Sequence, residues 1–363
     1  NSVMLNEKKG RFTPAQKIII AALAACLVWL LAQVPFLAEY LFARGVTRWI
    51  EGIVSAITGI FPFSFYEIVA VLLILGAAAL VLYICTHLSR ARRKSLPLLL
   101  RRLAAAAAAV FFAFCLLYAP LYNRTGVSSA LGLPDVQVTA ENAYAAAEYY
   151  VERLNALADD FGRDGEGDIL PELSFAETAE LLNARYDSLQ TDYFSPYAVN
   201  PKAVALSVPM SYLGITGIYF PFTGEANVNV NIPAYELPVT MAHEMAHAKG
   251  VARENEANIA AYVLCITAED PYLQYSGLMN AAAVLINSLP EEEYEELRSR
   301  LAPEILREYS NAGAHYAQYD GWIDRLSSFV NDLFLKSNGV PGGTRSYGQT
   351  AQSLVALYVK LCG

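Results

Sequence analysis

Residues 237–258, LPVTMAHEMAHAKGVARENEAN, decide the fold around them because they read as two short helices joined by a turn. Pro238 suits the first turn of a helix, where its missing N–H is not needed, and Gly250 suits the position just past a helix end. The apolar periodicity resumes from Arg253 onward. We therefore expect one helix over about residues 238–249 and a second over about residues 253–268.

Residues 243–247 read HEMAH, a pattern that is typical of zinc hydrolases. Residues four apart project from the same face of a helix, so the imidazoles of His243 and His247 can bind one ion. Glu244 would lie beside the open position of the metal and take a proton from bound water. The pattern predicts a Zn²⁺ site with Glu244 as general base. The alternative, two ordinary surface histidines, is weaker because the chain has only four histidines.

A catalytic zinc site needs a third protein ligand, and the second helix offers Glu254 and Glu256. Successive helical residues turn by about 100°, so these two carboxylates point to nearly opposite sides and only one can face the metal. Glu254 shares its face with Ala257, Asn258 and Ala261, whose small size favours close packing on the first helix. We expect Glu254 to be the third ligand, with Glu256 as the alternative.

The pair HEMAH and ENEAN resembles the gluzincins, zinc peptidases whose third ligand is a glutamate on a later helix. Several membrane-anchored and anti-repressor metalloproteases carry Glu-x-x-Ala-Asp or Glu-x-x-Ala-Asn at this place, and Glu254, Ala257 and Asn258 match this pattern. The resemblance implies the ligand role for Glu254. A metzincin is excluded, because Arg253 stands where its third histidine would be and arginine does not ligate zinc.

A wider resemblance is to a bacterial membrane family, the domain of unknown function 3810. It rests on hydrophobic N-terminal helices, on YFPFTGEANVN at residues 219–229, on the HEMAH block, and on VNDLFLKSNG followed by SYG near the C-terminus. This resemblance implies a membrane protein with a zinc-peptidase motif and no known substrate.

Three long apolar runs precede residue 122, at about residues 17–37, 66–86 and 103–121, and each can cross a hydrocarbon core of about 30 Å. They predict a membrane domain over residues 1–121 and a second domain over residues 122–363. Basic residues cluster before the first run and between the second and third. Such clusters are typical of cytoplasmic segments, so we expect a multi-pass protein of the bacterial cell membrane with residues 122–363 outside the cytoplasm.

The second domain is acidic, with 14 Lys plus Arg against 31 Asp plus Glu from residue 120 onward. This charge disfavours nucleic acid as a partner, which leaves the lipid bilayer and a peptide or protein substrate. Cys265 and Cys362 could form a disulfide outside the cytoplasm, although their spacing does not demand one.

We expect a mainly α fold, in which a mostly helical, zincin-like domain carries a small β-hairpin or edge sheet. Strands are expected over residues 204–209 and 217–231, with a turn near Thr223 and Gly224. Residues 227–231 could be the edge that pairs with an extended substrate, or part of a hairpin that only packs on the helix. An oxyanion-stabilising group would come from a set that no spacing singles out: His315, Tyr316, Tyr319, Arg345 and Tyr347.

These features together predict a membrane-anchored zinc metallopeptidase. A protease buried in the membrane is a weaker interpretation, because charged and amide side chains surround HEMAH too densely for a lipid-buried helix. A non-catalytic zinc-binding sensor or envelope scaffold is the alternative from another class. Glu244 argues mildly against it, since a structural zinc site needs no general base.

Overall fold

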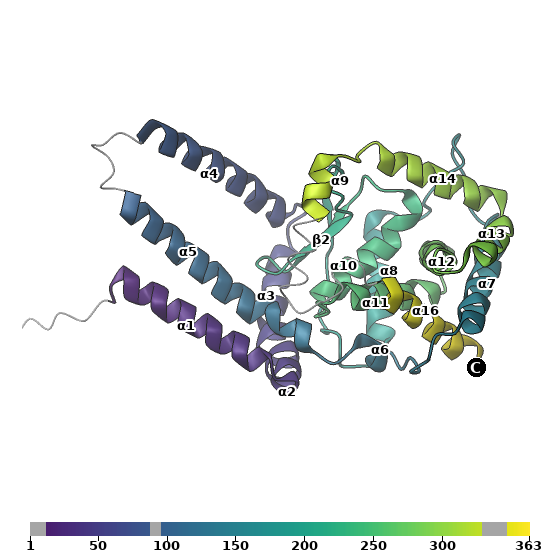
Figure 1. The fold of residues 1–363 in the computed structure, drawn as a ribbon, viewed down its shortest axis with the longest axis horizontal. Helices are drawn as coiled ribbons and strands as arrows, with labels where there is room; N and C mark the ends of the chain where they lie inside the picture. Colours follow the sequence, from purple (N-terminus) through teal and green to yellow (C-terminus); the bar gives the residue numbers. More distant parts are fainter. Residues whose placement is uncertain (1–11, 88–95, 329–346) are drawn as a thin grey trace, which may run out of the picture.

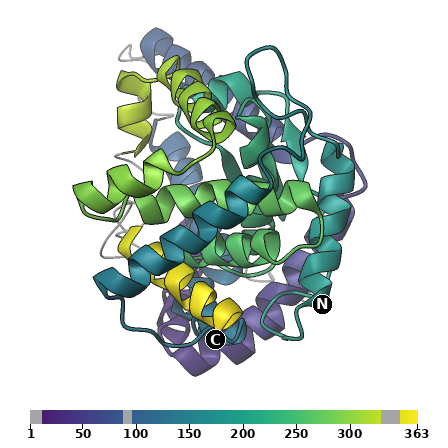
Figure 2. The ribbon, with the colours of Figure 1, turned by 90° about the vertical axis from the view of Figure 1, so that its right-hand side faces the viewer.

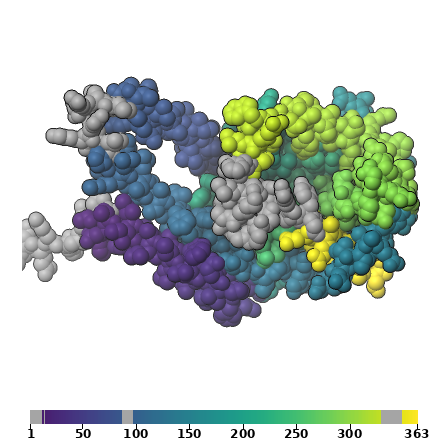
Figure 3. All heavy atoms as spheres, in the orientation of Figure 1, coloured from purple at the N-terminus to yellow at the C-terminus, as the bar shows by residue number. Residues whose placement is uncertain are grey.

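The computed structural model describes residues 12–87, 96–328 and 347–363, and most of this chain is helical. Three long apolar helices, α1 (Pro14–Ala32), α4 (Phe65–His87) and α5 (Leu96–Leu117), extend to one side of a helical domain (Figure 1). All three are long and apolar enough to span a membrane. Their apolar side chains face outward, and Figure 3 shows the helices as rods projecting from the domain. The mainly α class and the three apolar helices are confirmed.

The ends of these helices differ from the expected ranges because prolines set them. The first run ends at Ala32 rather than near residue 37, since Pro35 begins a separate short helix, α2 (Pro35–Leu37). The third begins at Leu96, with a proline at its start, and ends at Leu117 before the 3₁₀ turn η3 (Ala119–Asn123), which contains Pro120. Proline is tolerated in the first turn of a helix but not in its interior.

Residues between the first two long helices form ordered structure against the domain. A π-helix, η1 (Ala38–Val46), leads directly into α3 (Thr47–Thr58); η1 contacts η3, and α3 contacts α5. Glu39 of η1 is buried and forms an ion pair of 3.0 Å with Arg124, which follows η3. The residues that connect the spans are therefore packed against the domain that carries HEMAH.

The sheet has three strands in the order β1 (Lys202–Val204), β3 (Glu225–Asn229) and β2 (Gly217–Phe220). The β2–β3 hairpin turns at Gly224, whose φ of +61° favours glycine. Of the two alternatives for residues 227–231, the edge was wrong, because β3 pairs in parallel with β1 and antiparallel with β2. The strand expected over residues 204–209 ends at Val204, and the chain then forms α9 (Ser207–Ser211).

Helices α10 (Leu237–Ala248), α11 (Glu254–Ile266) and α12 (Pro271–Ile286) form the centre of the domain core and contact one another. On the face away from the long helices, α7 (Ala140–Ala156) lies beside the C-terminal α16 (Tyr347–Cys362) (Figure 2). Other helices of the domain surround this centre: α6 (Val127–Ala130), α8 (Phe175–Ser188), η4 (Ala234–Glu236), α13 (Glu291–Ser299) and α14 (Pro303–Ala317). Cys265 is buried and Cys362 is exposed, and both are free thiols.

Candidate metal centre

Helix α10 ends in a turn that its sequence encodes. Gly250 has φ of +99°, and a Cβ atom there would lie 2.9 Å from a nitrogen of Arg124. Its N–H donates to the carbonyl of His247, and the N–H of Val251 donates to the carbonyl of Ala246. This pair of bonds is the Schellman arrangement that closes a helix through a left-handed residue. The turn brings the carbonyl of Val251 back beside the helix that it ends.

That carbonyl fixes the orientation of His247. The ring Nδ1 of His247 donates to the Val251 oxygen at 2.7 Å, and the hydroxyl of Tyr118 lies 3.3 Å from the same nitrogen. In the neutral ring this bond keeps the proton on Nδ1, so the lone pair of Nε2 is free for a metal. Metal-binding histidines commonly donate the other ring N–H to a carbonyl in this way, which sets both the tautomer and the ring plane.

The side chains of His243, His247 and Glu254, here called the His–Glu cluster, converge at one point. The two Nε2 atoms lie 3.0 Å apart, and Oε2 of Glu254 lies 3.2 Å from Nε2 of His243 and 3.6 Å from Nε2 of His247. Ligand atoms of a tetrahedral zinc site are about 3.3 Å apart, since zinc–ligand bonds are about 2.0–2.2 Å. The donor types and their spacing therefore fit zinc, and three protein ligands leave a fourth position open.

Glu256 does not reach this cluster. It lies in an ion pair of 3.2 Å with Arg253 and accepts a hydrogen bond from the backbone N–H of Val127, at the start of α6. Burial raises the pKa of Glu256 to about 7, although Arg253 opposes this effect. Of the two candidate third residues, Glu254 therefore lies beside the imidazoles of His243 and His247. Glu256 instead lies at the N-terminus of α6.

Glu244 lies beneath the edge strand β2. Its side chain is 4% exposed and packs against Gly217, where a Cβ atom would come within 2.5 Å of Oε1. The backbone N–H of Tyr219 donates to the carboxyl group, and among the described residues Oε2 has no hydrogen-bond partner. Burial raises the pKa of Glu244 to about 7 against the opposing effect of the two histidines. A buried carboxyl group with one unsatisfied oxygen thus lies next to the His–Glu cluster.

The charges inside the cluster stabilise one another. Burial alone would raise the pKa of Glu254, but the imidazoles of His247 and His243 outweigh it, so the pKa falls well below its usual range. Burial would lower the pKa of His247, but Glu254 outweighs it and raises this pKa to about 9. The Glu254 side chain is 42% exposed, so the cluster is open to solvent on the side of α11.

Two residues of this region give no signal in the sequence. Tyr118, which directly follows α5, is buried and reaches His247, although in the sequence it continues an apolar run. Arg124 donates to the carbonyl of Gly250 at 2.6 Å and to Glu39, and its guanidinium lies 3.8 Å from the ring centre of Tyr193. Arg124 thus attaches the turn between α10 and α11 to helix η1.

The residues considered for oxyanion stabilisation have other partners. Nε2 of His315 donates to the carbonyl of Asn231 at 2.9 Å, and the hydroxyl of Tyr319 accepts from the side chain of Asn231. The hydroxyl of Tyr316 donates to Glu236, at the N-terminus of α10. Arg345 and the side chain of Tyr347 lie outside the described residues. Within the described chain, none of these contacts reaches the His–Glu cluster.

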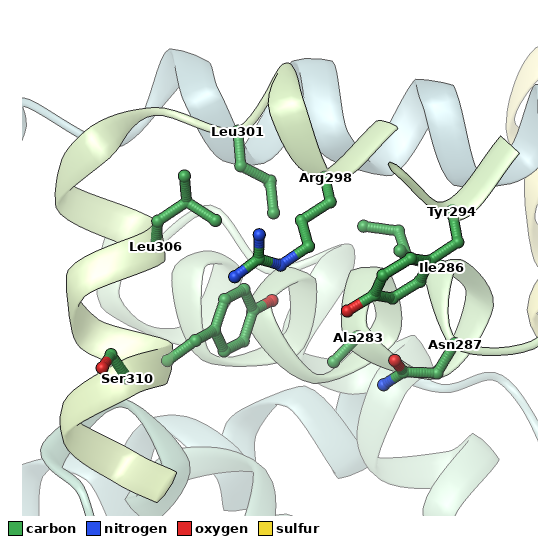
Figure 4. Close-up of a pocket in the computed structure, with 9 residues that line it drawn as sticks. Ala283, Ile286, Asn287, Tyr294, Arg298, Leu301, Leu306 and Ser310 are labelled. Atoms are coloured by element: carbon green, nitrogen blue, oxygen red, sulfur yellow. The ribbon is translucent and has the colours of Figure 1, made fainter. Parts of the chain in front are cut away.

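A separate cavity of about 330 Å³ lies between α12, α13 and α14 (Figure 4). Tyr294 and Arg298 of α13 and Asn287, which directly follows α12, extend into it, and no residue of the His–Glu cluster lines it. Among the described residues Arg298 forms no ion pair with a carboxylate, and both polar and apolar side chains line the cavity.

The family described as a protein of unknown function (DUF3810) matches residues 42–355, which is most of the chain. The chain belongs to this family. The range matched to DUF3810 includes α3, the second and third apolar helices, the sheet and both helices of the His–Glu cluster. No curated protein and no solved structure matches the chain.

Proposed function

We propose that this member of the DUF3810 family is a membrane-anchored zinc metallopeptidase. The observation that carries the proposal is the convergence of Nε2 of His243, Nε2 of His247 and Oε2 of Glu254 within 4.8 Å of one another. A buried carboxyl group, Glu244, lies on the same helix as the two histidines. Three protein ligands with a neighbouring general base are typical of catalytic rather than structural zinc sites.

The residues of the cluster would divide the work of peptide hydrolysis. His243, His247 and Glu254 would hold the ion, which when bound acts as a Lewis acid and activates water. Glu244 would accept the proton of the attacking water and then deliver it to the leaving amine. Gly217 and the N–H of Tyr219 hold this carboxyl group in place, and Val251 holds His247 in the tautomer that binds metal.

The edge strand β2 supports a peptide as substrate class. One edge of Gly217–Phe220 pairs with β3, and among the described strands nothing pairs with the other edge. Extended peptides bind such edges through main-chain hydrogen bonds. Because β2 also covers Glu244, a peptide added to this edge would run past the His–Glu cluster. This domain would lie outside the cytoplasm of a bacterial cell, because the basic segments flank the ends of the apolar helices that are opposite to the domain. Such basic segments are typical of the cytoplasmic side of a membrane.

Zinc content and peptide hydrolysis test this proposal together. The full chain is purified in detergent without added metal, its zinc is measured by elemental mass spectrometry, and its hydrolysis of a quenched fluorescent peptide library is followed. We expect one zinc per chain and slow hydrolysis that stops with a chelator. Glu244→Gln should keep the zinc and lose hydrolysis, since general-base catalysis contributes about 10²–10⁴-fold.

The same Glu244→Gln protein is the control for a contaminating protease, because it passes through the same purification. Hydrolysis that persists in this variant does not come from Glu244 and would contradict the proposed mechanism. Bound zinc without hydrolysis of any peptide would instead favour the sensor or scaffold. Absence of zinc after reconstitution would exclude the metallopeptidase.

A further inference from the structure

Helix α3 has its polar face buried and its apolar face exposed, the reverse of a helix that packs on a water-soluble domain. The buried residues of α3, which are 2–8% exposed, are all polar: Thr47, Glu51, Ser55 and Thr58. These four recur at helical spacing and form one face. A helix on the surface of a soluble domain normally buries an apolar stripe and presents polar side chains to water.

The buried polar face is attached to the domain by specific hydrogen bonds. The hydroxyl of Thr47 donates to the carbonyl of Leu116 at the end of α5, at 2.9 Å. The hydroxyl of Tyr219 donates to Oε2 of Glu51 at 2.7 Å, and Thr58 donates to the carbonyl of Thr223 at 2.9 Å. These partners come from a span, from β2 and from the hairpin turn. The direction of the polar face is therefore fixed by the fold.

The exposed face is large, apolar and free of charge. On α3, Trp49 is 73%, Ile53 59% and Ile57 56% exposed, and Ile60, two residues past its end, is 78% exposed. The only charged residues of α3 point inward, since Glu51 is buried and Arg48 donates to the carbonyls of Asp192 and Tyr193. Isolated apolar side chains on a surface need no explanation, but a contiguous apolar face marks an interaction site.

The position of this face identifies its partner. Helix α3 lies where α1 ends and α4 begins, and it contacts α5, so it sits at the domain ends of all three apolar helices. Figure 1 shows it lying crosswise between these helices and the domain. Beyond α3, the half-exposed rings of Phe61 and Phe63 continue the apolar surface to the start of α4.

We propose that α3 and the residues up to Phe63 lie in the membrane interface, with Trp49, Ile53, Ile57 and Ile60 in contact with the acyl chains of the leaflet nearest the domain. Helices of this kind lie in the plane of the interface with their apolar face about 5–10 Å deep, and aromatic side chains favour this depth. The exposed face continues the lipid-facing surface of the three spans, which favours lipid over a second copy of the chain. This inference does not depend on the proposed peptidase activity.

The placement of α3 also fixes the His–Glu cluster near the lipid surface. Glu51 binds the hydroxyl of Tyr219, and the backbone N–H of the same Tyr219 binds Glu244. Tyr219 of β2 therefore links the interfacial helix α3 directly to Glu244, the proposed general base. If the protein is a peptidase, its substrates would be cleaved close to the membrane surface.

Tryptophan fluorescence tests the placement directly, because the chain has only three tryptophans. The variant Trp29→Phe, Trp322→Phe leaves Trp49 alone. The full chain is reconstituted into nanodiscs of phosphatidylcholine that is unbrominated, brominated near the top of the acyl chains, or brominated near their ends. We expect strong quenching by shallow bromine, weaker quenching by deep bromine, and little quenching by aqueous acrylamide.

The matched control carries its only tryptophan on α13, the helix far from the spans in Figure 1, through Glu295→Trp with all three native tryptophans replaced by Phe. This control should be quenched by acrylamide and not by either lipid. The proposal is overturned if Trp49 behaves like this control, which would mean a water-exposed face. It is equally overturned if neither lipid nor acrylamide quenches Trp49, which would mean that protein covers the face; chemical crosslinking would then identify a second copy.

Discussion

Gly217 lies so close to Glu244 that a Cβ atom on the glycine would fall 2.5 Å from Oε1, 2.6 Å from Cγ and 2.7 Å from Cδ of the glutamate. Real Cβ atoms do not approach other atoms this closely, so only glycine leaves room for the carboxyl group in its present place. The contact joins the edge strand β2 to the helix that carries both histidines. The position of the proposed general base therefore depends on the absence of a side chain in the strand.

This contact predicts that Gly217→Ala lowers peptide hydrolysis at least about tenfold while zinc content stays at the wild-type level, because Glu244 must move and general-base catalysis depends on its position. Hydrolysis and zinc are measured on the same preparation. Gly313→Ala on α14 is the matched control, since nothing lies within 4 Å of a Cβ there. That control should keep full activity. Unchanged hydrolysis in Gly217→Ala would contradict the role given to the packing of Glu244.

The two glutamates at the start of α11 should differ in their effect on zinc. Glu254→Gln should lower zinc affinity sharply, because it removes the negative charge of the proposed ligand, whose Oε2 lies 3.2 Å from Nε2 of His243. Glu256→Gln should keep zinc, since that side chain binds Arg253 and the N–H of Val127. Zinc titration of the metal-free proteins with a fluorescent competitor measures both. Equal losses in the two variants would show that the effect of Glu254 is structural.

The turn between α10 and α11 was predictable from the sequence because its signals are local. HEMAH, Gly250 and the Glu-x-x-Ala-Asn pattern determine which residues share a helix face and where the chain reverses, and the structure brings together His243, His247 and Glu254. The three apolar helices were predictable for the same reason, since apolar length is itself a local property. Only their ends, which prolines set, were displaced.

The order of the strands and the contacts between distant segments could not be predicted from local patterns. Alternation along residues 225–229 indicates a strand but not its neighbours, and all five residues are buried because the strand is central. Tyr118 continues an apolar run, and only the folded chain brings it to His247. Helix α3 has a helical apolar pattern, but the direction of its two faces depends on contacts with Tyr219 and Thr223, which are distant in the sequence.

Removing one partner of the buried ion pair between Glu39 and Arg124 should destabilise the folded protein strongly. Burial would raise the pKa of Glu39, but hydrogen bonds and charges from Arg124 and Arg44 outweigh it and lower the pKa to about 2. Arg124→Met removes the main partner of the Glu39 carboxylate. Breaking a buried ion pair in this way lowers the free energy of unfolding by about 3–5 kcal/mol. We expect a clear fall in apparent melting temperature in detergent.

The double variant Glu39→Leu, Arg124→Met is the control for this pair. It removes both charges, so it should recover part of the lost stability, because replacing both partners by apolar groups is often nearly neutral. Arg44 keeps an acidic partner, Asp192, in the double variant. A double variant that is less stable than Arg124→Met alone would show that Glu39 stabilises the fold without Arg124, through Arg44 and Thr125.

Glu51 should make the stability of the domain depend on pH. Burial raises its pKa from 4.5 to about 8, although the hydrogen bond from Tyr219 opposes this, so the folded protein holds it protonated at neutral pH. In the unfolded chain the group ionises near pH 4.5. Its contribution to stability is therefore complete below pH 4.5 and is lost as pH rises through about 8, by up to about 1.4 kcal/mol per pH unit in that window.

Glu51→Gln isolates this effect, because the amide oxygen can still accept the hydroxyl of Tyr219 at 2.7 Å and the side chain stays neutral at every pH. We expect the apparent melting temperature of the wild type, measured in detergent at one heating rate, to fall more than that of the variant between pH 5 and pH 9. Above pH 8 the variant should be the more stable protein, since an ionised Glu51 would lie buried without a basic partner among the described residues. Parallel curves for the two proteins would mean that Glu51 is ionised in the folded state and that water reaches α3 from the domain side.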